Sequence, residues 1–163
     1  MDREFKIKER IVRKIIGCGS TIRVRDRFGI LVIDKLKRHN LPDDVKLEKI
    51  GPDGFSLLSS LEGFEKVIIA DSVKSGDSPG ELNIFSEKNL PDSDFSKFSV
   101  HHIDLSEILK ISQKVLGEKK PKRILIVGLD IEGLNSLEAS VPSVIEKSTI
   151  RATELLLRLI NNF

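Results

Sequence analysis

Three short apolar runs share one pattern along the chain: basic residues come first, then β-branched and aliphatic residues, and then Gly or Asp. The runs are residues 13–17, 66–71 and 122–128. Their apolar residues are continuous rather than alternating, which is typical of strands covered on both faces, as in a parallel sheet. We expect these three runs to be the central strands of the fold.

Apolar residues also recur at three- and four-residue spacing, which predicts amphipathic helices. The sets with this spacing are Phe28, Leu31, Val32 and Leu36; Ile108, Ile111 and Val115; and Ile145, Thr149, Ala152, Leu156 and Ile160. Strands that alternate with helices predict an α/β three-layer sandwich with right-handed crossovers. The expected architecture is a mostly parallel five-stranded sheet with helices on both faces, phosphorylase/hydrolase-like and with flavodoxin-like wiring.

Two weaker patterns complete the expected sheet. Residues 45–50 alternate well enough to pair beside the first strand. Residues 81–85 place Leu82 and Ile84 against polar neighbours, which indicates an exposed edge strand that can run antiparallel. The segments 72–79 and 89–99 are rich in Ser and Asp and are long for loops of a compact domain, which is typical of a functional rim.

Length and composition narrow the class of protein. The chain has 163 residues, which predicts one domain over 1–163 with an N-terminal extension at 1–12. The net charge of +2 supplies no field for a polyanion, so we expect no nucleic-acid partner. One cysteine excludes a disulfide framework and a multi-cysteine metal site. No apolar run reaches the length of a membrane span, and the charged N-terminus lacks a signal-peptide core, so we expect a cytoplasmic protein.

The expected sheet places chemistry at one edge. In open α/β sheets, ligands bind outside the carboxyl ends of the strands, where the strand order reverses. The loop after the first strand carries Asp26, and the third strand is expected to end at Asp71. His101 precedes a helical pattern and is the third candidate, with His102 as the alternative. Two carboxylates and an imidazole suit a divalent metal with open positions, and with or without metal they can activate water.

Each candidate also has a purely structural interpretation. An Asp after a buried strand is often a helix N-cap, and a histidine in a loop is often simply solvated. The segment Gly17-Cys18-Gly19 resembles the start of a dinucleotide-binding fingerprint, but Ile22 occupies the place of its third glycine. The turn from Gly17 to Ser20 is also a candidate anion nest for a phosphate or nucleotide. Cys18 is best explained as a small buried filler.

Several segments together resemble the endopeptidases that mature nickel–iron hydrogenases. The first loop of that family reads G-x-G-N, then a carboxylate and x-x-G, and its later segments read I-I-A-D-A, S-x-H, L-V-G and P-x-V. The matching positions are Gly17, Gly19, Asp26 and Gly29; Ile68-Ile69-Ala70-Asp71-Ser72; Ser99-Val100-His101; Ile126-Val127-Gly128; and Pro142-Ser143-Val144. The resemblance runs from about residue 14 to the end of the chain.

This resemblance implies a function and a site. The family cuts a C-terminal extension from the nickel-loaded large-subunit precursor of a hydrogenase, so that precursor is the implied partner. Asp26, Asp71 and His101 correspond to the family's proposed metal-binding set, and the metal is nickel supplied by the precursor. Asp26 and Asp71 would act in metal recognition or in water activation, as in an aspartic-type peptidase. No organic cofactor and no membrane are implied.

Departures from the family pattern keep a second interpretation open. Ser20 replaces the usual Asn, and the acidic segment after the second strand is altered to Ile50-Gly51-Pro52-Asp53-Gly54. Arg23, Arg25 and Arg27 surround Asp26, where they would hold it ionised or compete with a metal. These changes suggest a divergent member, of the archaeal deazaflavin-reducing hydrogenase type or one that has lost cleavage. The alternative function is a metal-dependent maturation chaperone that binds the precursor without cutting it.

Overall fold

The structure is a computed structural model and describes residues 12–74, 78–89, 105–135 and 137–163. The expected N-terminal extension lies outside the described residues except for Val12, and so do His101 and His102. The assignment of residues 1–163 to one domain therefore stays a prediction.

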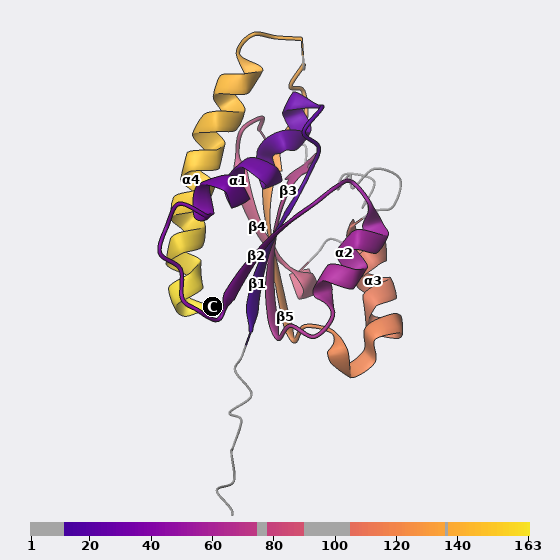
Figure 1. The fold of residues 1–163 in the computed structure, drawn as a ribbon. Helices are drawn as coiled ribbons and strands as arrows, with labels where there is room; N and C mark the ends of the chain where they lie inside the picture. The colour runs from indigo at the N-terminus through magenta and orange to yellow at the C-terminus, as the bar shows by residue number, and fades with distance from the viewer. Residues whose placement is uncertain (1–11, 75–77, 90–104, 136) are drawn as a thin grey trace, which may run out of the picture.

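The described chain forms one five-stranded sheet with helices on both faces (Figure 1), as the sequence predicts. The strands are β1 Arg13–Cys18, β2 Val45–Ile50, β3 Lys66–Val73, β4 Leu82–Ser86 and β5 Arg123–Asp130. The helices are α1 Phe28–Leu36, α2 Gly54–Leu61, α3 Leu105–Leu116 and α4 Val141–Asn162, with short 3-10 turns η1 Val24–Arg27, η2 Glu87–Asn89 and η4 Gly117–Lys119. None of the described helices is both long enough and apolar enough to cross a bilayer.

The strand order is β2-β1-β3-β5-β4. Strands β2, β1, β3 and β5 are parallel, and β4 pairs antiparallel with β5 at the edge. The order reverses between β1 and β3, as expected, but β5 rather than β4 lies beside β3, so the flavodoxin order does not hold at that edge. The run of apolar residues in β5 is continuous and fits an interior position, whereas the alternating β4 suits an edge.

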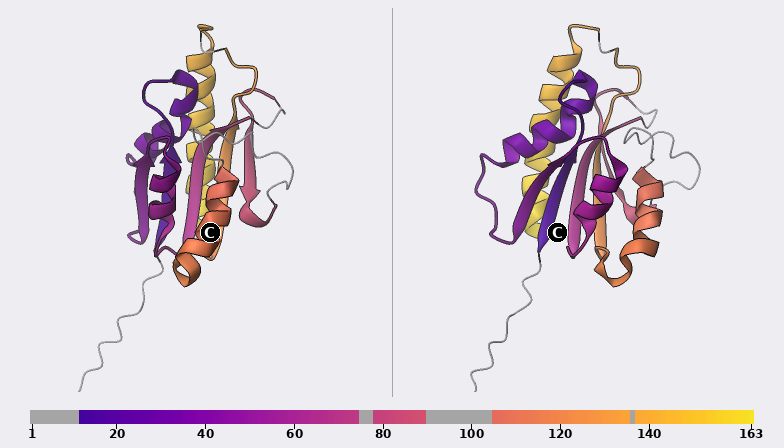
Figure 2. Two further views of the ribbon diagram at one scale, coloured as in Figure 1. Left: turned by 90° about the vertical axis from the view of Figure 1, so that its right-hand side faces the viewer. Right: turned by 45° about the vertical axis from the view of Figure 1, so that its right-hand side comes forward.

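Two apolar clusters lie on opposite faces of the sheet. Helices α1 and α4 cover one face, and α2 and α3 cover the other, as Figures 1 and 2 show. Because side chains alternate along a strand, neighbouring residues enter different clusters. Ile15 of β1 packs in the cluster under α1 and α4, and Ile16 packs in the cluster under α2 and α3. The central strands are thus buried on both faces, as their continuous apolar runs predict.

A buried lysine fastens α2 to the sheet. Lys14 of β1 is 9% exposed, and its Nζ donates to the carbonyl and the hydroxyl of Ser60 at 3.0 and 3.1 Å. It also forms an ion pair with Glu48 of β2 and lies 4.4 Å from the centre of the Phe64 ring. Lys14 is a buried charge with ionic and hydrogen-bonded partners, and it joins two strands to one helix.

Three features differ from the sequence-based expectations. Helix α2 has no counterpart in them, because its eight residues are too few for a clear helical period. Strand β3 continues past Asp71 to Val73, since β5 still offers backbone partners there. In α3, Ile111 and Val115 are 39% and 63% exposed, although their spacing matches that of the buried Ile108.

Candidate active site

Two glycines allow the segment after β1 to lie against the carboxyl end of the sheet. A Cβ on Gly19 would lie 2.1 Å from the carbonyl oxygen of Asp26, and one on Gly29 would lie 2.2 Å from that of Cys18 and 2.4 Å from that of Ala70. These are backbone atoms, so a side chain could be admitted only by moving η1 or α1 away from β1 and β3. The glycine spacing in the sequence is therefore a requirement for close packing.

The same segment is closed by its own backbone. The N–H of Ser20 donates to the Asp26 carbonyl at 2.9 Å, and the N–H of Asp26 donates to the Arg23 carbonyl at 3.0 Å. The hydroxyl of Ser72 in β3 donates to the Arg25 carbonyl at 2.7 Å. Asp26 is half-buried in η1, on a turn that is hydrogen-bonded to the strand that carries Asp71.

Asp71 lies where β1 and β3 separate. The β1–β3 pairing ends at Gly17 and Ala70, whereas β3 stays paired with β5 for three more residues. The Asp71 side chain is 4% exposed, and its Oδ1 accepts a hydrogen bond from the N–H of Ser72 at 2.8 Å. Its Oδ2 is buried without a hydrogen-bond partner among the described residues. A buried carboxylate oxygen without a partner is energetically costly, and such atoms are rare in folded proteins.

The charge of Asp26 influences the pKa of Asp71. Burial raises the pKa of Asp71 well above its ordinary value, the hydrogen bond from the Ser72 N–H opposes this rise, and the charge of Asp26 adds to it. The structure therefore brings Asp26 and Asp71 within electrostatic reach of each other. A carboxyl pair in unequal environments can hold one proton between them or bind a cation with both members.

The third predicted residue and its alternative, His101 and His102, lie outside the described residues. Within the described ranges, no three His, Cys, Asp or Glu side chains are grouped so that they could hold a metal ion. The three-residue metal set thus stays a prediction.

The arginines near Asp26 have a role that the sequence did not reveal. Arg25 Nη1 donates to the carbonyl of Leu134 at 2.7 Å, and Arg27 Nε donates to the carbonyl of Thr21 at 3.0 Å. Leu134 lies in the connection between β5 and α4, so Arg25 joins two loops at this edge. These two guanidinium groups hold backbone in place, a function for which a basic residue in a loop gives no sequence signal.

Two other interpretations of the sequence can be compared with this geometry. In the candidate anion nest, the N–H of Gly19 donates to the carbonyl of Ile50 and that of Ser20 donates to the carbonyl of Asp26. The N–H of Ile22 donates to the hydroxyl of Ser20. These three N–H groups are therefore not free to bind an anion. Burial raises the pKa of the Cys18 thiol well above its ordinary value, with Asp71 and Glu48 adding to the rise. Cys18 is thus a buried filler and a poor nucleophile.

The acid of the altered segment is also accounted for. Asp53 caps α2: its Oδ1 accepts from the N–H of Phe55 at 3.0 Å, and its Oδ2 accepts from the hydroxyl of Ser56 at 2.8 Å. The hydrogen bonds from Ser56 and Phe55 lower the pKa of Asp53. This carboxylate therefore has a structural role as an N-cap.

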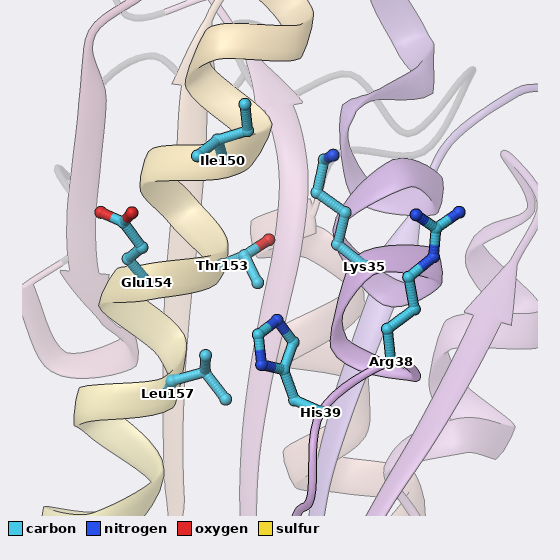
Figure 3. A pocket seen from close by; sticks show the side chains of 7 residues that line it. All are labelled: Lys35, Arg38, His39, Ile150, Thr153, Glu154 and Leu157. Carbon is cyan, nitrogen blue, oxygen red and sulfur yellow. The ribbon is translucent and has the colours of Figure 1, made fainter.

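A cavity of about 310 Å³ lies elsewhere, between the end of α1 and the middle of α4. Figure 3 shows its lining, which consists of Lys35, Arg38, His39, Ile150, Thr153, Glu154 and Leu157. None of the predicted site residues is among them. The carboxylates lie at the carboxyl ends of the strands and not in this cavity.

Comparison with known proteins identifies the family of this chain. The family model described as hydrogenase maturation protease matches residues 30–159. The chain belongs to the hydrogenase maturation protease family. Members of this family are peptidases, and the described edge with Asp26 and Asp71 is the candidate active site of this member.

Individual relatives show the same likeness. A putative hydrogenase maturation protease of Methanocaldococcus jannaschii is 33% identical over 98 residues, which cover 59% of this chain and 64% of that protein. The matched part thus spans less than two thirds of that relative's length.

Solved structures share the fold. The hydrogenase maturating endopeptidase HybD of Escherichia coli has a TM-score of 0.70 at 24% identity, covering 90% of this chain and 93% of that one. A hydrogenase 2 maturation peptidase from a Thaumarchaeota archaeon has a TM-score of 0.64 at 30% identity, covering 92% and 98%.

Proposed function

We propose that this protein is a cytoplasmic endopeptidase that removes a C-terminal extension from the large-subunit precursor of a nickel–iron hydrogenase. The proposal rests on membership of the hydrogenase maturation protease family together with one observation: the buried Asp71 carboxyl feels the charge of Asp26, and its Oδ2 has no hydrogen-bond partner among the described residues. A peptidase needs a group that activates water or polarises a peptide bond, and this pair supplies carboxyl chemistry with one member, Asp71, largely removed from water.

The carboxyl pair also suits recognition of the nickel that the precursor carries. Oxygen ligands bind divalent first-row metals, and Asp71 Oδ2 has no described donor to satisfy it. A precursor that brings a cation compensates the buried carboxylate, whereas a precursor without metal leaves it uncompensated. We assign His101 as the third ligand, with His102 as the alternative, on the strength of the Ser99-Val100-His101 match to the family pattern.

The decisive experiment mixes the purified protein with a nickel-loaded large-subunit precursor and follows the precursor's mass. We expect a shortened product with the wild type, no product with Asp26→Ala or Asp71→Ala, and an unchanged product with Asp34→Ala. Asp34 is a matched control because it is an exposed aspartate of α1 that pairs with Lys49.

The same experiment tests the alternative function. A maturation chaperone would bind the precursor tightly and leave its mass unchanged. The altered segment that suggested this alternative contains Asp53, whose carboxylate is engaged as the cap of α2. A wild-type protein that binds the loaded precursor but yields no shortened product would contradict the endopeptidase proposal.

A further inference from the structure

The most exposed apolar side chains of the described residues gather at one edge of the sheet. Leu137, Ile22 and Phe55 are 91%, 86% and 67% exposed, more than any other large apolar side chain that the structure describes. Single exposed apolar residues are common on protein surfaces. These three, however, all lie in segments that directly follow the carboxyl ends of parallel strands, namely β5, β1 and β2. Figure 1 shows these connections at the same end of the molecule.

Hydrogen bonds join the three segments into one frame around Asp71. Gly19 N donates to the carbonyl of Ile50 at 3.2 Å, which links the segment of Ile22 to that of Phe55. Arg25 Nη1 donates to the carbonyl of Leu134, which links the segment of Ile22 to that of Leu137. The hydroxyl of Ser72, next to Asp71, donates to the carbonyl of Arg25. The exposed side chains are thus attached to the same backbone frame as the carboxylate.

The opposite end of the sheet, where the parallel strands begin, has a different surface. There, lysines pair with glutamates at the surface: Lys119 with Glu62 at 3.1 Å and Lys122 with Glu65 at 3.6 Å. Charged pairs of this kind suit contact with water. Val115, 63% exposed in the last turn of α3, is an exposed apolar side chain at that end, but the three most exposed ones all lie at the carboxyl edge.

We propose that Ile22, Phe55 and Leu137 form an apolar rim that binds an apolar surface of the hydrogenase precursor and holds its cleaved segment over Asp71. This inference rests on the proposed function, because a protein substrate that reaches Asp71 must also cover the loops around it. The rim is continuous with the candidate active site through the three hydrogen bonds described above. The precursor is therefore the occupant that the arrangement favours, rather than a second copy of this chain.

The test compares serine substitutions in the full chain. Ile22→Ser, Phe55→Ser and Leu137→Ser are assayed singly, together with the double variant Ile22→Ser/Leu137→Ser. Val115→Ser is the matched control, because Val115 is 63% exposed but lies in the last turn of α3. Burial of one such side chain in an interface supports a loss of about tenfold per substitution. We expect kcat/KM to fall by about that factor through KM, with kcat retained and Val115→Ser unchanged.

A binding titration separates this inference from the proposed function. The nickel-loaded precursor is titrated onto each rim variant in an Asp71→Asn background, where binding is measured without cleavage. If the wild type shortens the precursor and the rim variants do so with unchanged kcat/KM, the rim is refuted and the endopeptidase stands. If the wild type shortens nothing, the endopeptidase is refuted, and a rise in Kd in the rim variants alone still supports the rim. Unchanged Kd values, or a wild-type dimer that the rim substitutions convert to a monomer, would overturn it.

Discussion

Replacing Asp71 by asparagine should stabilise the metal-free protein although it removes a group from the candidate active site. Asparagine keeps the shape of the side chain and an oxygen that can accept from the N–H of Ser72, but it carries no charge. In the wild type the carboxyl is 4% exposed, and one oxygen has no partner among the described residues. The buried charge therefore lowers the stability of the folded state whenever Asp71 is ionised.

The size and the pH dependence of this effect follow from burial. Asparagine still buries a polar NH2 at the position of Oδ2, so it relieves only the extra cost of a charged over a neutral unsatisfied group. Taken as about 1–3 kcal/mol, this is for a chain of this size a change in Tm of roughly 2–12 °C. Burial raises the pKa of Asp71 well above its ordinary value. Stability is therefore full below the ordinary aspartate pKa of about 4 and falls as the pH rises through the raised pKa. The gain from asparagine should be largest at alkaline pH and should shrink toward pH 4.

Urea denaturation with a chelator present, at pH 8 and pH 5, measures this gain. Asp34→Asn is the control, because it alters only an exposed ion pair with Lys49 and should shift stability by less than about 1 kcal/mol at either pH. Two results would refute the reasoning. One is an Asp71→Asn protein that is no more stable than the wild type at pH 8. The other is a gain of equal size at both pH values.

Three further predictions concern the packing that surrounds the site. Gly29→Ala should lower the free energy of unfolding by about 3 kcal/mol or more, because the added Cβ would meet backbone atoms. Gly51→Ala is the control: nothing lies within 4 Å of its Cβ, so the same urea titration should show little change. Cys18 should resist iodoacetamide at pH 8 in the native protein and react after denaturation, because burial raises its pKa; rapid native alkylation, followed by mass spectrometry, would contradict its burial. Glu48→Gln should cost about 1 kcal/mol at pH 7 after solvent screening. Burial raises the pKa of Glu48, but the hydrogen bonds from Lys14 and Ser60 and the charge of Lys14 together lower it by more, so its pKa is lowered overall. The wild type should therefore lose this advantage as the pH falls through that lowered pKa, and an equal cost at pH 3 would count against the ion pair.

The parts of the fold that the sequence predicts are those set by local pattern. The runs of β1, β3 and β5 are buried on both faces, and the alternating β4 lies at the edge. The positions of Asp26 and Asp71 at one edge follow from the general geometry of parallel sheets. The family resemblance adds the expectation that these residues act together, and that expectation stays a prediction.

The features that the sequence does not predict depend on contacts between distant segments. Helix α2 combines its Asp53 cap and Ser60 under Lys14 with only two fully buried apolar residues, Leu57 and Leu61, too few to make a helical period visible in the sequence. Arg25 binds a carbonyl 109 positions away in the chain, and no local pattern encodes that contact.

Close packing and an unsatisfied carboxylate are two consequences of one arrangement at the carboxyl edge. The absence of side chains at Gly19 and Gly29 lets η1 and α1 lie against β1 and β3, and this covers Asp71 and brings Asp26 toward it. The same closeness removes water from Asp71 Oδ2 and provides no described donor in its place. A bulkier residue at position 19 or 29 would force the layers apart and admit water. Water would lower the energetic cost of the buried carboxylate, and a cation would then stabilise it less. For recognition of a metal-bearing precursor at this site, the glycines would matter as much as the carboxylates do, because they set the packing that buries Asp71.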